Sequence, residues 1–528
     1  MKKQPVLNQR LFSKSRFLIV LALVLLAAGL TCVSAQAELR SGQGNGSALG
    51  RIETLKKTLQ KAGFSLTPGQ FTYWDMVEAT CEGKLPQAGN NPWPNIYLSL
   101  QLPPHPGVQL PLPIDRYWQL GKDEAIVLVG QTPPGVRFFH YQTFAIMVAG
   151  IQHRMMMPVG DAINIGTIKT IGPDKYNAPI VYIITGNRET ERRVRAAALK
   201  AGYPEAIINI EAISPVIAPL GVGAEGSWFA LVHRIAVPLE KTAVEDYGRN
   251  PPYSAFRIKP DQPLADDPEP VPVLRVRGTG HTEMALYPAL KKLRQAILDR
   301  YAGMPAKELD TNITHEPQLP DNHESIGEKP YVGLQRGIDV FGTSRDNATL
   351  NSYPSFRLRG GNDEFVIVYG VNHQTTGKAI YASFTPYLDK DRWFGLKDGT
   401  VTSNNYDGDG NPGDSARRFL CPGDPSQCPE DVQYLYAWKV ARQCNEEPYC
   451  MELKAEFVNM DGEAYECNLY DWYKDFTNPP LIGPFDLDAM DMFVNWRTYM
   501  EPATNVGPDD NELLYDRVIY FGPYFDEQ

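Results

Sequence analysis

One pattern occurs twice along the chain, and it limits the possible folds more than any other feature of the sequence. Residues 123–130 read DEAIVLVG, and residues 363–370 read DEFVIVYG. Two further matches follow in the same order, GVRFF with GKAIY and FALVHR with FVNWR. Because order and turn residues match as well as hydrophobicity, the sequence predicts one ancestral unit present twice. The alternative is coincidence, since Val/Ile-rich strands resemble one another.

Apolar periodicity predicts a mixed fold. Ala125–Val129 and Phe365–Tyr369 are short apolar runs bounded by acidic pairs and glycine, which is typical of buried strands. A Pro-Pro-Gly turn should join the first run to Val136–Phe144 as a hairpin. Residues 180–213 show a strand, helix and strand in turn. One clear helix among many strands favours an α+β fold of two tandem, duplicated, mainly antiparallel β modules with a short helical N-terminal segment.

Composition divides the chain further. Residues 48–82 should form two helices, and the Pro- and Asp-rich residues 259–272 are typical of a linker. The predicted segments are a signal peptide at 1–37, a helical segment at 38–94, a first module at 95–260, a linker, helix and irregular bridge at 261–335, and a second module with a Cys-rich insertion at 336–528.

The amino terminus has the three parts of a secretory signal. Five basic residues precede an apolar run from Phe17 to Leu30, and Ala35-Gln36-Ala37 follows as a small-residue cleavage site. An uncleaved anchor is the alternative, but the run is shorter than the ~20 residues that a membrane span requires. The sequence therefore predicts cleavage after Ala37 and a periplasmic or extracellular protein with no transmembrane span in the mature chain.

Six cysteines remain after the predicted cleavage, and an even number in an exported chain predicts disulfides. Short Pro-, Gly- and acid-rich loops favour the pairs Cys421–Cys428 and Cys444–Cys450. Cys81 and Cys467 are left as a third pair, which would tie the N-terminal segment to the second half. Free buried thiols are the alternative.

A calcium site is predicted at residues 407–414. Asp407, Asp409, Asn411 and Asp414 alternate with glycine and proline, so the backbone can wrap a cation that prefers six to eight oxygen ligands. The pattern is not an EF-hand, and an acidic turn without metal is the alternative. A nucleotide cofactor is not expected, because the GVGAEG motif at 221–226 precedes a strand-like segment where the fingerprint requires a helix. No haem is expected.

Two pairs of polar residues are candidates for function. Asn372 and His373 follow the second buried strand in a polar loop, where catalytic groups are usually presented, although a hairpin loop is the plainer interpretation. Arg234 and Arg497 occupy matched places in apolar strands. They should form structural ion pairs, or else bind an anion through their planar guanidinium groups.

These features leave two functional hypotheses, and whether the protein is an enzyme stays open. The first is a secreted hydrolase or lyase with His373 as general acid or base in the second module. The second is a non-enzymatic extracytoplasmic protein whose duplicated module binds a small molecule or carbohydrate. A nucleic-acid partner is not expected, since the net charge is −11 and no basic block compensates for it.

Overall fold

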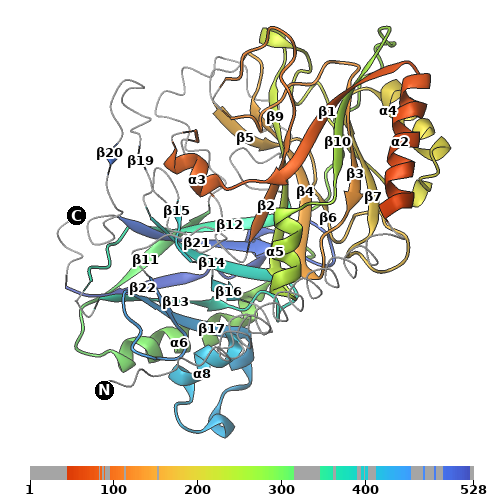
Figure 1. Ribbon diagram of the computed structural model, residues 1–528. Helices are drawn as coiled ribbons and strands as arrows, with labels where there is room; N and C mark the ends of the chain where they lie inside the picture. Colours follow the sequence, from red (N-terminus) through yellow and green to blue (C-terminus); the bar gives the residue numbers. More distant parts are fainter. Residues whose placement is uncertain are drawn as a thin grey trace, which may run out of the picture.

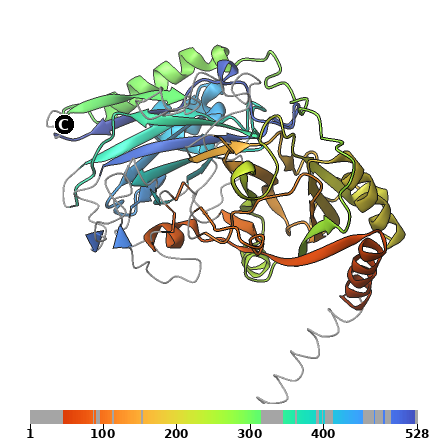
Figure 2. The same ribbon diagram turned by 90° about the horizontal axis from the view of Figure 1, so that it is seen from above.

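The computed structural model consists of two large β-sheets that lie side by side, each with a pair of helices on one face (Figures 1 and 2). The structure describes residues 45–82, 84–85, 88–89, 95–111, 114–150, 154–313, 345–360, 364–388, 394–397, 399–401, 412–453, 468–469, 481–482 and 491–523. Within these residues, no helix is long and apolar enough to cross a membrane.

The first sheet combines ten strands from residues 64 to 260. In spatial order they are β5 (Arg154–Pro158), β4 (Val136–Met147), β9 (Trp228–Pro238), β2 (Ile96–Gln101), β1 (Phe64–Tyr73), β10 (Ser254–Pro260), β3 (Ala125–Gln131), β7 (Pro179–Thr185) and β8 (Ile208–Ala212), and β6 (Ile163–Asn164) pairs with β4. All neighbours are antiparallel except β7 and β8, which are parallel. The helix α4 (Arg188–Lys200) connects that parallel pair, as the sequence predicts.

The second sheet repeats this order strand for strand. Its members are β15 (Phe394–Gly395), β14 (Tyr381–Leu388), β21 (Met492–Tyr499), β12 (Asn347–Tyr353), β11 (Ala306–Ile313), β22 (Arg517–Phe521), β13 (Phe365–Val371), β17 (Leu435–Ala441) and β18 (Cys450–Glu452), and β16 (Gly399–Val401) pairs with β14. Its outermost pair, β17 and β18, is also parallel. The structure thus has the predicted α+β fold with two tandem, mainly antiparallel sheets. A separate two-stranded sheet joins β19 (Asn468–Leu469) and β20 (Leu481–Ile482).

The registers of the two sheets agree as well as their order. On β9, Arg234 lies opposite His140 of β4, and on β21, Arg497 lies opposite Ser383 of β14. Three residues after each of these arginines lies a non-glycine residue with left-handed backbone, Val237 with φ 57° and Met500 with φ 49°. Such a conformation is costly for a β-branched residue. Its presence at matched positions supports descent from one unit.

Helices cover equivalent faces of the two sheets (Figure 1). In the first module α2 (Asn45–Lys61) packs beside α4, and Leu55 and Leu59 are fully buried there. In the second, α6 (Tyr287–Arg300) packs beside α8 (Pro412–Leu420). Two shorter helices are α3 (Met76–Cys81) and α5 (Lys241–Arg249).

Two local predictions were wrong. The strands β3 and β4 do not form a hairpin, because β10 and β7 occupy both edges of β3 and β4 pairs with β9 instead. Residues 48–82 form a helix, a strand and a helix, since β1 lies between α2 and α3. Its Pro68-Gly69 pair disfavours a helix, and hydrogen bonds from β10 and β2 complete it as a strand.

The two modules meet through matched residues. A buried cluster between the sheets contains Phe138, Ala236, Val237, Tyr381, Tyr499 and Met500, three from each module. By register, Phe138 corresponds to Tyr381 and Ala236 corresponds to Tyr499. The Phe138 ring lies 5.8 Å from that of Tyr381 and 5.1 Å from that of Tyr499. Both modules therefore present the same surface to one another.

Candidate functional site

His373 lies at the end of β13 and is buried between two carboxylates. Its Nδ1 is 2.9 Å from Glu283 Oε1, and its Nε2 is 3.2 Å from Asp516 Oδ2. The ring is 1% exposed. Burial by itself disfavours the charged ring, but Glu283 and Asp516 outweigh it and raise the pKa of His373 to about 10.

These contacts keep the His373 ring protonated and do not suit it to transfer a proton to or from a substrate. At neutral pH both ring nitrogens are protonated and both donate to carboxylates, so neither has a lone pair for a substrate proton. Further contacts hold the carboxylates in place: Glu283 accepts from Thr376 and from the Leu514 amide, and Asp516 accepts from Tyr436. The arrangement supports a structural role for His373.

Asn372 shapes the loop that carries this histidine. Its side-chain Oδ1 accepts from the amides of Gln374 and Thr375, at 3.2 and 3.4 Å, and the residue is fully buried. Such contacts from an Asn side chain to the following backbone are typical of a turn. The contacts of Asn372 therefore support the hairpin-loop interpretation.

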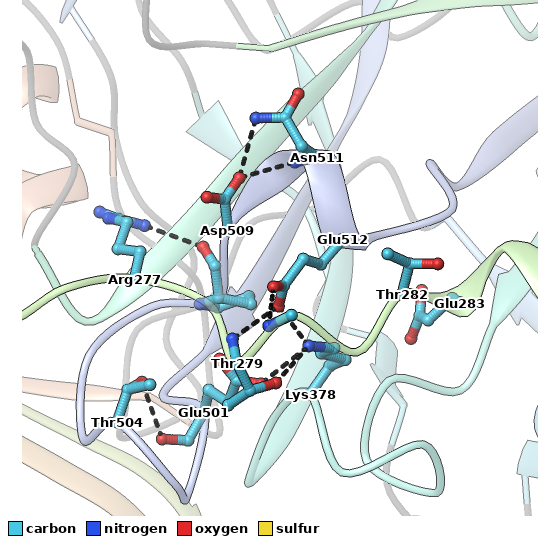
Figure 3. Close-up of polar contacts among 12 residues, drawn as sticks. Arg277, Thr279, Thr282, Glu283, Lys378, Glu501, Thr504, Asp509, Asn511 and Glu512 are labelled. Carbon is cyan, nitrogen blue, oxygen red and sulfur yellow. Dashed lines mark hydrogen bonds and ion pairs between the residues drawn. The ribbon is translucent and has the colours of Figure 1, made fainter.

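A second buried cation lies a few residues further on (Figure 3). Lys378 Nζ donates to Glu501 Oε1 at 2.9 Å, to Glu512 Oε2 at 2.5 Å and to Thr279 Oγ1 at 3.1 Å. Glu512 also accepts from the amides of Thr279 and Gly280. Together with Glu283, these contacts fasten the segment before α6 to the second sheet.

The first module has neutral side chains at the place where the second module has the buried charges of His373 and Asp516. Gly130 and Gly370 end the repeated segment. A Cβ atom added to Gly130 would lie 2.3 Å from the Tyr253 ring, and one added to Gly370 would lie 2.0 Å from Asp516 Oδ1. In the first module the Tyr253 hydroxyl lies 2.6 Å from that of Tyr141 and donates to the Gln131 carbonyl. No local sequence pattern points to Asp516, because the matched glycines mark its position only after the sheets are aligned.

Arg234 and Arg497, the candidate binding residues, converge at the junction of the modules. The Arg234 guanidinium lies 4.4 Å from the centre of the Tyr499 ring and 5.2 Å from that of Tyr97. The Arg497 guanidinium lies 5.9 Å from the Tyr387 ring. The two arginines are 5% and 8% exposed.

The two guanidinium groups are within electrostatic reach of one another. Burial lowers the pKa of Arg497 and the phenols of Tyr387, Tyr499 and Tyr97 raise it, while the charge of Arg234 opposes the protonation of Arg497. The net pKa of Arg497 is raised, so this arginine is cationic throughout the physiological range, and a guanidinium group is in general always charged in proteins. The structure thus concentrates two positive charges among tyrosine rings.

A buried hydroxyl adds a polar group to this place. Tyr499 is fully buried, and its hydroxyl has no hydrogen-bond partner within the described part of the chain. Burial raises the pKa of Tyr499, and Arg234 and Arg497 act in the opposite direction. Because the net pKa stays raised, the phenol remains a neutral hydrogen-bond donor.

Both short-loop disulfides predicted from the sequence are present, Cys421–Cys428 and Cys444–Cys450. Cys81 is disulfide-bonded as well. Its predicted partner, Cys467, lies outside the described residues. Bonds of this kind are typical of proteins that fold in an oxidising compartment.

The predicted calcium ligands are only partly described. Asp407, Asp409 and Asn411 lie outside the described residues, and Asp414 belongs to α8. Calcium binding at residues 407–414 therefore stays a prediction.

If that loop holds calcium, chelation with EDTA should lower the melting temperature, and added calcium should restore it. A hundredfold excess over Kd contributes about 2.7 kcal/mol. Asp409→Ala should remove the calcium-dependent difference, whereas Asp424→Ala, at an exposed acid of the same insertion, should keep it. Differential scanning calorimetry measures this effect, and identical melting curves with EDTA and calcium would exclude the metal.

No protein-family model matches the chain, and no curated protein matches it. Among solved structures, it is similar to the crystal structure of the VPA0106 protein from Vibrio parahaemolyticus, with a TM-score of 0.34 and 10% identity over 89% of this chain and 95% of that one. Similarity at this level carries no inference about function, which depends instead on the contacts described above.

Proposed function

We propose that this protein is an exported, non-enzymatic binding protein that holds a small anion where Arg234 and Arg497 converge. The observation that carries the proposal is the convergence itself. The two arginines lie 263 positions apart in the chain, occupy the same register in two copies of one module, and meet at the junction between the copies.

The chemistry of the site suits an anion. A guanidinium group is planar and presents its donors in a fork that fits carboxylate, phosphate and sulfate. In a buried setting such a pair is electrostatically stronger than in water, because the local dielectric is lower. The Tyr499 hydroxyl supplies a further donor, and the surrounding rings limit the motion of both arginines.

The geometry of His373 favours binding over catalysis. A general acid or base must be able to exchange a proton with a substrate, and His373 is buried with both nitrogens directed at carboxylates. Export is supported by the N-terminal signal pattern and by the disulfides. A pair of packed sheets, with two disulfides in the second module, suits a protein that presents a preformed site.

Anion binding should depend on both arginines. Sulfate, phosphate or a short dicarboxylate should raise the melting temperature of the wild-type protein above its value in chloride at equal ionic strength, which controls for screening. Arg234→Gln and Arg497→Gln should each lose this rise. Isothermal titration calorimetry measures the same binding directly.

Arg116→Gln is the matched control for that experiment. Arg116 is another largely buried arginine of the first module, and it donates to Thr72 and to backbone carbonyls of β1 and β2. Its loss should reduce stability and leave the anion effect in place. An anion effect of equal size in all three variants, or none in the wild type, would contradict the proposal.

A further inference from the structure

We propose that Glu211 makes the first module sensitive to pH. As a neutral carboxyl group it joins the two ends of the first sheet, and loss of its proton to water loosens that contact. The residues concerned are Glu211 of β8, Thr143 of β4 and Tyr182 of β7, which we call the Glu211 cluster. None of them belongs to the proposed anion site.

Glu211 connects strands from opposite ends of the sheet. In the spatial order, β8 is the last strand at one end and β4 is the last but one at the other. The Thr143 amide donates to Glu211 Oε1 at 2.8 Å, and the hydroxyls of Thr143 and Tyr182 donate to Oε2, the latter at 2.9 Å. The Glu211 side chain thus satisfies a backbone amide of a strand that is not its neighbour in the sheet.

The carboxyl group of Glu211 is buried without a cation beside it. The residue is 5% exposed, and within the described part of the chain its side chain contacts the amide and the two hydroxyls just named and forms no ion pair. A buried carboxylate without a counter-ion is costly. Burial therefore raises the pKa of Glu211 to about 7, although the hydrogen bonds from Thr143 and Tyr182 act in the opposite direction.

The ionisable groups around the cluster stay neutral while Glu211 titrates. The Tyr141 ring lies 5.2 Å from the Tyr182 ring, and His233 stacks on Tyr141 at 4.0 Å. Burial lowers the pKa of His233 to about 3. Burial also raises the pKa of the four phenols in this part of the core, Tyr141, Tyr182, Tyr247 and Tyr253. Among these groups, Glu211 is therefore the one whose charge changes near neutral pH.

The second module has other side chains at the matched positions. The strand registers match Glu211, Tyr182 and Thr143 with Met451, Trp438 and Pro386, in that order. Met451 and Trp438 are 2% and 5% exposed and belong to one apolar cluster. The same fold thus forms without a carboxyl group at this place. A buried ionisable group that the fold does not require is a candidate for function.

The test measures urea unfolding of the full mature protein and of its Glu211→Gln variant from pH 4.5 to 8. Glutamine keeps the shape of the neutral carboxyl group but cannot ionise, so the ratio of the two unfolding constants isolates the titration of Glu211. The raised pKa stabilises the wild type fully below pH 4.5, and this stabilisation is lost as the pH rises through about 7. The unfolding constant of the wild type should therefore rise relative to that of the variant by up to about tenfold per pH unit, and the ratio should level off above pH 7.

Hydrogen exchange shows where the contact loosens. Above pH 7 the amides of β4 and β8 should exchange faster in the wild type than in Glu211→Gln at the same pH. The amides of β18, the counterpart of β8, should exchange equally in both proteins. Glu205→Gln, at an exposed glutamate shortly before β8, is the matched control and should behave as the wild type does.

A ratio of unfolding constants that does not change between pH 4.5 and 7 would overturn the proposal. Exchange that becomes faster in β18 to the same extent as in β8 would overturn it too, because the effect would then be global. If Glu211→Gln does not fold, Glu211→Met takes its place, since methionine is the residue of the second module at the matched position. The same dependence of the ratio on pH is expected with either variant.

Discussion

Replacement of His373 by glutamine is expected to lower the free energy of unfolding by about 3–5 kcal/mol. His373 is the cation between the buried carboxylates of Glu283 and Asp516, and removing one partner of a buried pair leaves uncompensated charge. Urea denaturation followed by circular dichroism measures the loss. His281→Gln, an exposed histidine of the adjoining segment, is the matched control and should change stability little.

The pH dependence of this effect has a definite sign. The pKa of His373 is raised from its ordinary 6.5 to about 10 in the folded protein, so folding takes up a proton between those values. The stabilisation is fully present below pH 6.5 and is lost as the pH rises through about 10, by about 1.4 kcal/mol per unit. The difference between wild type and variant should shrink accordingly, and a difference that is constant from pH 6.5 to 10 would refute the charged histidine.

A loss of similar size is expected when Phe138 is replaced by alanine. Its side chain is fully buried at the junction of the modules and packs on Tyr381 and Tyr499. Truncation of a buried phenylalanine to alanine costs about 3–5 kcal/mol, because a cavity remains. Tyr353→Ala, at a residue that is 62% exposed, should be nearly neutral.

The same variant tests how the modules are joined. Because Phe138 contacts the second module, its loss should increase hydrogen exchange at the facing ends of both β4 and β14, beyond the increase within the first sheet alone. Anion affinity should fall too, since Arg234 rests on the Tyr499 ring. Increased exchange confined to the first module would show that the junction does not depend on this contact.

Several features could be predicted because they depend on neighbours in sequence. The buried strands β3 and β13, the β7–α4–β8 unit and the two short-loop disulfides follow from local hydrophobic pattern, capping and loop length. The duplication also showed in the sequence, because descent from one unit preserves order and turn residues. The composition of the chain did not predict that β1 is a strand, because its extended conformation depends on hydrogen bonds to β2 and β10 on either side.

What the sequence by itself determined is the set of elements, their repetition, and the fact that Arg234 and Arg497 are counterparts. Only the tertiary structure decided what those residues contact. His373 meets Glu283 and Asp516, which lie 90 and 143 positions away, and such pairings leave no local pattern. The arginines converge because the two copies pack through the same apolar patch, and the geometry of that packing depends on the shape of Phe138, Tyr381 and Tyr499 together.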